Sequence, residues 1–128
     1  MTEVQNWGTT TFAVNAINGA GVVVGYGQRP NGNLTAFSWQ NGVMSDLSTL
    51  GAYTSANAIS ESGLIAGEAA VNGSLHAVWW NWNHQIEDLG ALPQSNFSSA
   101  FGITSGGIVT GVSSGDGQNS SFHAVLWK

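Results

Sequence analysis

The sequence contains no cysteine among its 128 residues. This absence excludes disulfides, thiol nucleophiles and cysteine-ligated metals, and it leaves the redox compartment open. No stretch approaches the ~18 uninterrupted apolar residues of a membrane-spanning helix. The amino-terminal MTEVQNWGTT has neither the basic nor the apolar region of a secretory signal peptide. The sequence as written shows no targeting signal, so it is compatible with a cytoplasmic protein and with a secreted protein whose signal has been removed.

Charged residues are also scarce, at 7% of the chain, with 2 Lys and Arg against 7 Asp and Glu. Nucleic acids and anionic membranes are bound through clusters of Lys and Arg, so we predict neither as a partner. Hydrophobic residues make up 42% of the chain and include six Trp, which excludes disorder. This length and composition predict one folded domain over residues 1–128, an all-β protein rich in tight turns.

The chain repeats itself three times. The segments AINGAGVVVG, AISESGLIAG and GITSGGIVTG align without gaps, and Ile17, Ile59 and Ile103 are spaced by 42 and then 44 residues. Each segment precedes a variable polar stretch and then a strand that ends in Trp. Such self-similarity defines the architecture. We predict repeats of about 42 to 47 residues at about 10–51, 52–93 and 94–128.

Each repeat has the pattern of four short strands. The first hairpin turns at a small polar residue and ends at Gly, which is the type I turn preference: Asn18 to Gly21, Ser60 to Gly63 and Thr104 to Gly107. A further glycine ends each exit strand, where it predicts a bulge or a close backbone approach: Gly25, Gly67 and Gly111. The fourth strand is GVMSDL at 42–47 and QIEDLG at 85–90.

The third strand of each repeat carries the signature LTAFSW, LHAVWW or FHAVLW, with Trp39, Trp80 and Trp127 at equivalent places. Both faces of these strands are largely apolar, which predicts burial on both sides between stacked sheets. Since Thr35 replaces the histidine in the first repeat, we interpret His76 and His123 as core histidines bonded to a backbone carbonyl, rather than as ligands or bases.

Three motifs together carry a family resemblance: Ala-Ile-Asn-x-x-Gly-x-Val-x-Gly, His-Ala-Phe/Val-x-Trp and Asp-Leu-Gly-x-Leu. The chain resembles the bacterial HAF-type (His-Ala-Phe) extracellular repeat over essentially its whole length, although Thr35, Val78 and Val125 depart from the triplet. The resemblance implies a β-propeller-like array in a secreted or cell-surface protein. It offers no catalytic residues to carry over.

The third repeat stops at Trp127 and Lys128, before a fourth strand. We expect residues 1–9, around Val4 to Trp7, to supply that closing strand. Propellers typically have ~4–8 blades, so three repeats predict a homodimer with six blades. A single-chain β-trefoil or β-prism is the alternative fold.

Catalytic groups do not stand out. No nucleophile is placed with a base, and His76, His84 and His123 lack a metal-ligand spacing. We therefore predict no enzyme, no metal and no cofactor. The stretch WWNWNH at 79–84 adds aromatics beside amides, a combination that suits sugar rings, and its candidate ligand-binding residues are Trp79, Asn81, Trp82, Asn83 and His84. Packing of these Trp residues at a subunit contact is the competing interpretation.

The sequence thus favours a non-enzymatic, lectin-like module that binds glycans through repeated sites on a propeller. A purely structural or engineered self-assembling set of blades without a ligand is the alternative. A hydrolase is the third and least favoured class.

Overall fold

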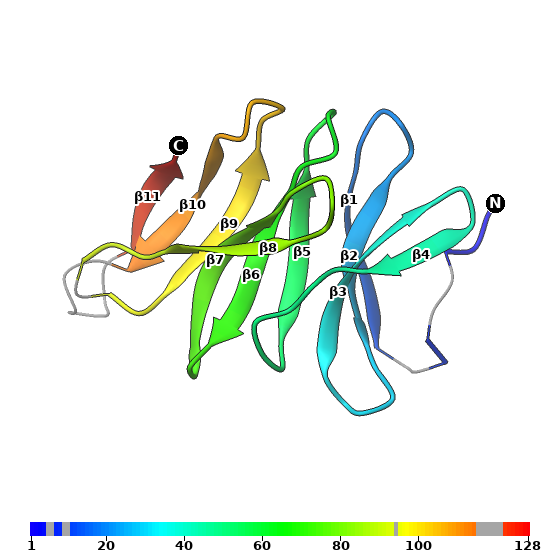
Figure 1. Cartoon of the computed structure of the whole chain (residues 1–128), viewed down its shortest axis with the longest axis horizontal. Coiled ribbons are helices and arrows are strands. Elements are labelled where there is room, and N and C mark those ends of the chain that lie inside the picture. The colour runs from blue at the N-terminus through cyan, green and yellow to red at the C-terminus, as the bar shows by residue number, and fades with distance from the viewer. Residues whose placement is uncertain (5–6, 9–10, 94, 115–121) are drawn as a thin grey trace.

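The protein is built entirely of β-strands where its structure is described. The computed structural model describes residues 1–4, 7–8, 11–93, 95–114 and 122–128, which form eleven strands in three antiparallel sheets (Figure 1). Within these ranges there is no helix, and so none long and apolar enough to cross a membrane. The all-β prediction is confirmed.

Each sheet is an up-and-down meander in which neighbouring strands follow one another in the chain. The first sheet consists of β1 (Phe12–Ile17), β2 (Val23–Gln28), β3 (Leu34–Gln40) and β4 (Val43–Asp46). The second consists of β5 (Thr54–Ile59), β6 (Ile65–Val71), β7 (Ser74–Trp80) and β8 (Ile86–Gly90). The third consists of β9 (Ser98–Ile103), β10 (Val109–Ser114) and β11 (Phe122–Trp127). These boundaries confirm the expected third strand of all three repeats and the expected fourth strand of the first two.

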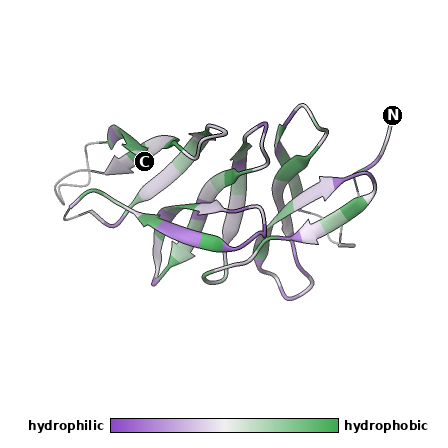
Figure 2. Ribbon diagram, turned by 45° about the horizontal axis from the view of Figure 1, so that its top comes forward, coloured by the Kyte–Doolittle hydropathy of each residue, from purple (hydrophilic) through white to green (hydrophobic). Residues whose placement is uncertain are grey.

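The three sheets stand in a row, with the chain termini at opposite ends (Figure 1). Strand β5 contacts β1, β2 and β3 of the first sheet, and β9 contacts β5, β6 and β7 of the second. The second sheet therefore lies between the other two. In Figure 2 the most hydrophobic stretches fall in strands of all three sheets.

The predicted first turn is present in every repeat. The amide nitrogens of Gly21, Gly63 and Gly107 donate to the carbonyl oxygens of the turn's first residue at 3.0 to 3.1 Å. Each of these glycines has a positive φ, between 83° and 98°. The side-chain oxygen of the first residue then accepts a hydrogen bond from the amide four positions on. The turn itself therefore favours a small polar residue at its first position and, at its last, a residue such as glycine that tolerates a positive φ.

The glycine expected to end each exit strand does not end it, because β2, β6 and β10 continue for at least three residues beyond Gly25, Gly67 and Gly111. Each of these glycines lies against backbone. A side chain at Gly67 would overlap the carbonyl oxygen of Ser55, and Gly25 and Gly111 face Ala13 and Ser99 in the same way. The pairing register shifts beside each of them, on β1, β5 and β9. Both halves of the prediction, a bulge and a close approach, are confirmed.

The core lies between successive sheets. Val24 and Ala36 of the first sheet pack in one cluster with Ile65, Val78 and Trp80 of the second. A second cluster joins the second and third sheets around Ala66, Ala77, Ala100 and Val109. Face-to-face packing thus buries apolar side chains that one sheet could not cover by itself.

Buried hydrogen bonds tie the same interfaces together. The hydroxyl of Thr54 accepts a hydrogen bond from the amide of Ala36 at 2.8 Å, and the hydroxyl of Ser98 accepts one from Ala77 at 2.7 Å. In each pair the hydroxyl belongs to the first strand of one sheet and the amide to the third strand of the preceding sheet. A repeated polar contact thus fixes how neighbouring sheets align.

Two expectations for the third strands are wrong in part. The centres of β3 and β7 are buried, but Phe122, His123 and Ala124 of β11 are exposed, because no sheet of the described chain lies beyond the third one. His76 is half-buried, and its Nδ1 lies 2.9 Å from Oδ2 of Asp88, a carboxylate rather than a backbone carbonyl. Asp88 also accepts the amide of Gly90, as a turn-capping residue does.

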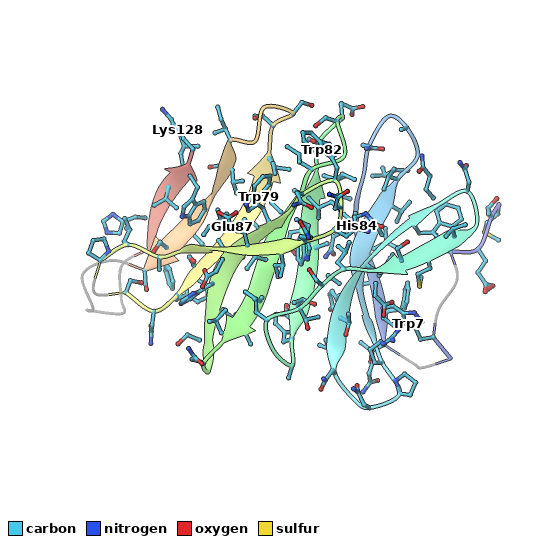
Figure 3. The ribbon with its side chains drawn as sticks, viewed as in Figure 1. Trp7, Trp79, Trp82, His84, Glu87 and Lys128 are labelled. Carbon is cyan, nitrogen blue, oxygen red and sulfur yellow. The ribbon has the colours of Figure 1, made fainter. Side chains whose placement is uncertain are left out.

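The amino-terminal segment is described only in part, since residues 5, 6, 9 and 10 lie outside the described residues. Trp7 packs edge-on against Phe12 and Phe37, and the Arg29 guanidinium lies 4.5 Å from its ring centroid. This anchors Trp7 on the first sheet, at the opposite end of the row from β11 (Figures 1 and 3).

Candidate binding cleft

A cleft of about 460 Å³ opens between the first sheet and the turns of the second, and we call it the first cleft. It is lined by Val22, Ser38, Gln40, Asn41, Val43 and Ser45 from the first sheet and by Gly63, Ile65, Trp82 and His84 from the second. Figure 3 shows Trp82 and His84 in the region between β5 and β1. Two of the five predicted ligand-binding residues therefore line one cavity.

Trp82 is the most prominent of these residues, with 65% of its surface exposed. Its indole N–H donates to the carbonyl oxygen of Ser62 at 2.6 Å. Its ring covers Gly63, where an added Cβ would meet the indole at 3.5 Å. The hydrogen bond and the contact hold the ring on the β5–β6 turn, so what it offers to a ligand is its apolar surface.

His84 owes its position to a tight turn. The hydrogen bonds between Asn81 and Gln85 repeat those of the Asn18 turn: Asn81 N donates to Gln85 O at 3.1 Å and His84 N to Asn81 O at 2.9 Å. His84 takes the place of the turn glycine, with a φ of 61°. A histidine in this left-handed region is uncommon, and strained positions of this kind concentrate at functional sites.

The two asparagines of the stretch do not line the cleft. The side chain of Asn81 is used by its own turn, in which Oδ1 accepts the amides of Asn83 and Gln85 at 2.9 and 3.1 Å. Asn83 is exposed, and its backbone rather than its side chain makes this contact. Both residues shape the loop that carries Trp82 and His84.

Trp79 lies at a different interface. It lines a second cleft, of about 110 Å³, between the second and third sheets, with Glu87, Leu89, Gly107, Val109, Trp127 and Lys128. Trp79 pairs with Glu87 across β7 and β8, just as Ser38 pairs with Ser45 across β3 and β4. The two clefts are therefore equivalent, and Trp79 brings a large ring where Ser38 leaves space.

The first cleft is neutral. Its described lining contains no Asp, Glu, Lys or Arg, and His84 is its single titratable side chain. Hydroxyl and amide groups of Ser38, Gln40, Asn41 and Ser45 can donate and accept hydrogen bonds. Among the described residues, no three His, Asp or Glu side chains are placed together as metal ligands would be. The arrangement suits recognition of a polar, uncharged molecule.

Sequence reasoning missed the half of the cleft that the first sheet supplies. The signal was present, because Ser38 is small where the second repeat has Trp79 and the third has Leu126. It could be read only once the sheets were known to stack, since a cleft between repeats depends on residues from both.

One perturbed group lies away from the cleft. The hydroxyl of Tyr53 donates to Glu68 Oε2 at 2.8 Å, and the Ser99 hydroxyl donates to the other carboxylate oxygen. Burial, reinforced by the adjacent Glu68 carboxylate, raises the pKa of Tyr53 well above its ordinary value. This network links the second sheet to the third.

Comparisons with known proteins add no further assignment. No protein-family model matches the chain, and neither curated proteins nor solved structures give a match. The geometry of the first cleft and of the sheets around it is therefore the basis for assigning a function.

Proposed function

We propose that this protein is a non-enzymatic binding module that takes a neutral, hydroxyl-rich ligand, a carbohydrate, in the first cleft. The observation that carries the proposal is the largely exposed Trp82 beside a cleft without charged side chains. An indole face packs well against the C–H face of a sugar ring, while hydroxyls bond to neutral amides and hydroxyls. Gln40, Asn41 and His84 are placed to make these polar contacts.

The proposed scaffold is a β-propeller-like ring of six sheets formed by two copies. Three meander sheets stacked face to face, with their first strands in contact, support this arrangement. A β-trefoil or β-prism is less well supported, because the first and third sheets lie at opposite ends of the row (Figure 1). The motifs that resemble HAF-type repeats favour the same scaffold. Since Trp79 lines the second cleft, which is smaller than the first, the first cleft is the more open of the two.

Binding is tested with a glycan array and with a titration of tryptophan fluorescence by the sugars that it identifies. We expect binding by the wild-type chain and a loss of at least tenfold in affinity on Trp82→Ala, because the stacking surface is removed. Trp79→Phe is the matched control, since it changes a Trp outside the first cleft. Absence of signal on the array together with unchanged fluorescence would overturn the proposal.

A self-assembling structural unit without a ligand is the second candidate. The observation that favours it is the exposure of large apolar residues on both end sheets, among them Val14 and Ile17 on β1 and Phe101 on β9. Dimers that bind no sugar would support this candidate over the first. A hydrolase gains no support from the cleft, which offers one titratable side chain.

A further inference from the structure

The outer edge of the third sheet is open in the described chain. Strand β11 pairs with β10 alone, whereas the equivalent strands β3 and β7 each pair with a fourth strand. An unpaired edge presents a row of backbone amide and carbonyl groups and is a template for another strand. The question is which segment completes it.

The first eight residues have the sequence of such a strand. MTEVQNWG at 1–8 aligns without gaps with MSDLSTLG at 44–51, which begins within β4. Met and Gly are identical, Thr replaces Ser, Glu replaces Asp, and Val replaces Leu. Met1–Val4 therefore corresponds to the last three residues of β4 and the buried Leu47 that follows them.

The register of β3 with β4 then predicts the new pairing. Trp39 pairs with Met44, Ser38 with Ser45 and Phe37 with Asp46. Transferred to β11, this register places Met1 opposite Trp127, Thr2 opposite Leu126 and Glu3 opposite Val125.

The same register gives His123 an acidic neighbour. In the second sheet Asp88 lies opposite Val78 and reaches back to His76, with a nitrogen-to-oxygen distance of 2.9 Å. Glu3 would stand in the same relation to His123, which is exposed in the described chain. In this register Glu3 would give His123 the carboxylate partner that Asp88 gives His76.

The chain cannot deliver this strand to its own third sheet, because its two ends lie at opposite ends of the row (Figure 1). The first sheet in turn lacks a hydrogen bond that the second sheet makes to its preceding neighbour. Trp80 donates its indole N–H to the carbonyl oxygen of Ser48, in the segment that follows β4, but the equivalent buried N–H of Trp39 has no partner among the described residues.

The residues that would face each other between two copies also differ, as a pair, from those at the two interfaces within the chain. Asn15 and Asn57 donate to the carbonyls of Ala56 and Ala100 of the next sheet at 2.9 and 3.0 Å. In the third sheet the position of Asn15 and Asn57 is taken by Phe101, which is 57% exposed. In the first sheet the position of Ala56 and Ala100 is taken by Val14, which is 56% exposed. An apolar pair would thus replace the amide-to-carbonyl contact where the third sheet of one copy meets the first sheet of another.

We propose that Met1–Val4 of one copy adds to β11 of a second copy as its fourth, antiparallel strand. Two such exchanges, related by twofold symmetry, close the ring. The inference rests on the two-copy scaffold proposed above and is independent of sugar binding.

The absence of cysteine allows a test of the register by disulfide formation. Cysteines bridge only when their Cα atoms are ~4.4–6.8 Å apart and their side chains point toward each other. We expect Thr2→Cys with Leu126→Cys to form a covalent dimer under mild oxidation, because the two residues are directly opposite. Glu3→Cys with Leu126→Cys is the matched control, which places the thiols on opposite faces of the strands. Equal cross-linking of the two variants would overturn the proposal.

Charge exchange gives a second readout. Glu3→Lys should weaken the dimer roughly twofold to tenfold in dissociation constant, and adding His123→Glu should restore it. Light scattering of the wild-type chain separates the possible failures. A particle of twice 13.3 kDa without the specific cross-link would reject the strand exchange and leave the ring. A monomer would reject both, and sugar binding would remain a separate measurement.

Discussion

The carbonyl oxygen of Ser55 occupies the space into which a side chain at Gly67 would extend. The two residues lie on neighbouring strands, beside the point where the register of β5 and β6 shifts. The same relationship holds in the other two repeats. The repeated glycine is thus a consequence of the bulge, since only a residue without a Cβ lets the two backbones come so close.

Gly67→Ala should therefore destabilise the protein strongly. The new methyl group would meet backbone, which cannot swing aside as a side chain can, so we expect a loss of ~3 kcal/mol in the free energy of unfolding. Gly106→Ala is the matched control, because its Cβ would meet only Thr104 Oγ1, at 3.9 Å. That change should stay within ~0.5 kcal/mol. Urea denaturation of both variants measures the difference, and equal losses would contradict this account of the bulge.

The hydroxyl of Thr54 should stabilise the folded protein, because it accepts the hydrogen bond of the buried Ala36 amide. Thr54→Val preserves the shape of a fully buried side chain but leaves the amide of Ala36 without its acceptor. An unsatisfied buried donor costs ~1–3 kcal/mol, and we expect a loss in that range from chemical denaturation. Thr110→Val removes an exposed hydroxyl that donates to Val125, where water can replace it. If both variants lose the same stability, the inter-sheet hydrogen bond has no special role.

The turns and bulges of this fold could be predicted from the sequence because they depend on residues close together in the chain. Asn18 and Gly21 determine a turn by side-chain chemistry and backbone conformation alone, and the prediction was correct in all three repeats. Burial depends on neighbours further away. β11 has the same alternating pattern as β7, yet most of its residues are exposed, because no sheet of the described chain lies beyond the third one.

The candidate site was only half predictable for the same reason. Trp82 and His84 stood out because the stretch 79–84 places aromatics beside amides, and both line the first cleft. Trp79 stood out for the same reason but fills the equivalent position at the next interface. A sequence pattern shows that a residue is exceptional, whereas the stacking of the sheets decides whether it faces solvent or a neighbouring sheet.

The stability of the protein should fall at alkaline pH through Tyr53. Its pKa is raised in the folded state by burial and by Glu68, so the folded protein holds this proton more tightly than the unfolded chain does. The resulting stability is fully present below the ordinary tyrosine pKa near 10 and is lost as pH rises beyond it, by at most ~1.4 kcal/mol per pH unit and less where water screens the phenol.

Tyr53→Phe provides the comparison. It should lower stability below pH 10, because the hydrogen bond to Glu68 is lost, and it should make the alkaline decline shallower. Urea denaturation at several pH values between 8 and 11 tests the sign, and parallel curves would show that Tyr53 does not carry the effect.

His84→Gly should change stability and sugar binding in opposite directions. The backbone of His84 is held at a φ of 61°, a conformation that costs an L-residue ~1–2 kcal/mol and glycine little. After the greater entropy of glycine in the unfolded chain is subtracted, we expect a gain of ~0.5–1 kcal/mol in the free energy of unfolding. The same change removes the imidazole from the first cleft, so affinity for the sugar should fall.

Asn72→Gly is the control, because Asn72 has a φ of 51° and does not line the cleft. It should stabilise the protein slightly and leave binding unchanged. If His84→Gly stabilises the protein without weakening binding, the strained histidine has no part in recognition, and Trp82 with the amides of the first sheet must account for it.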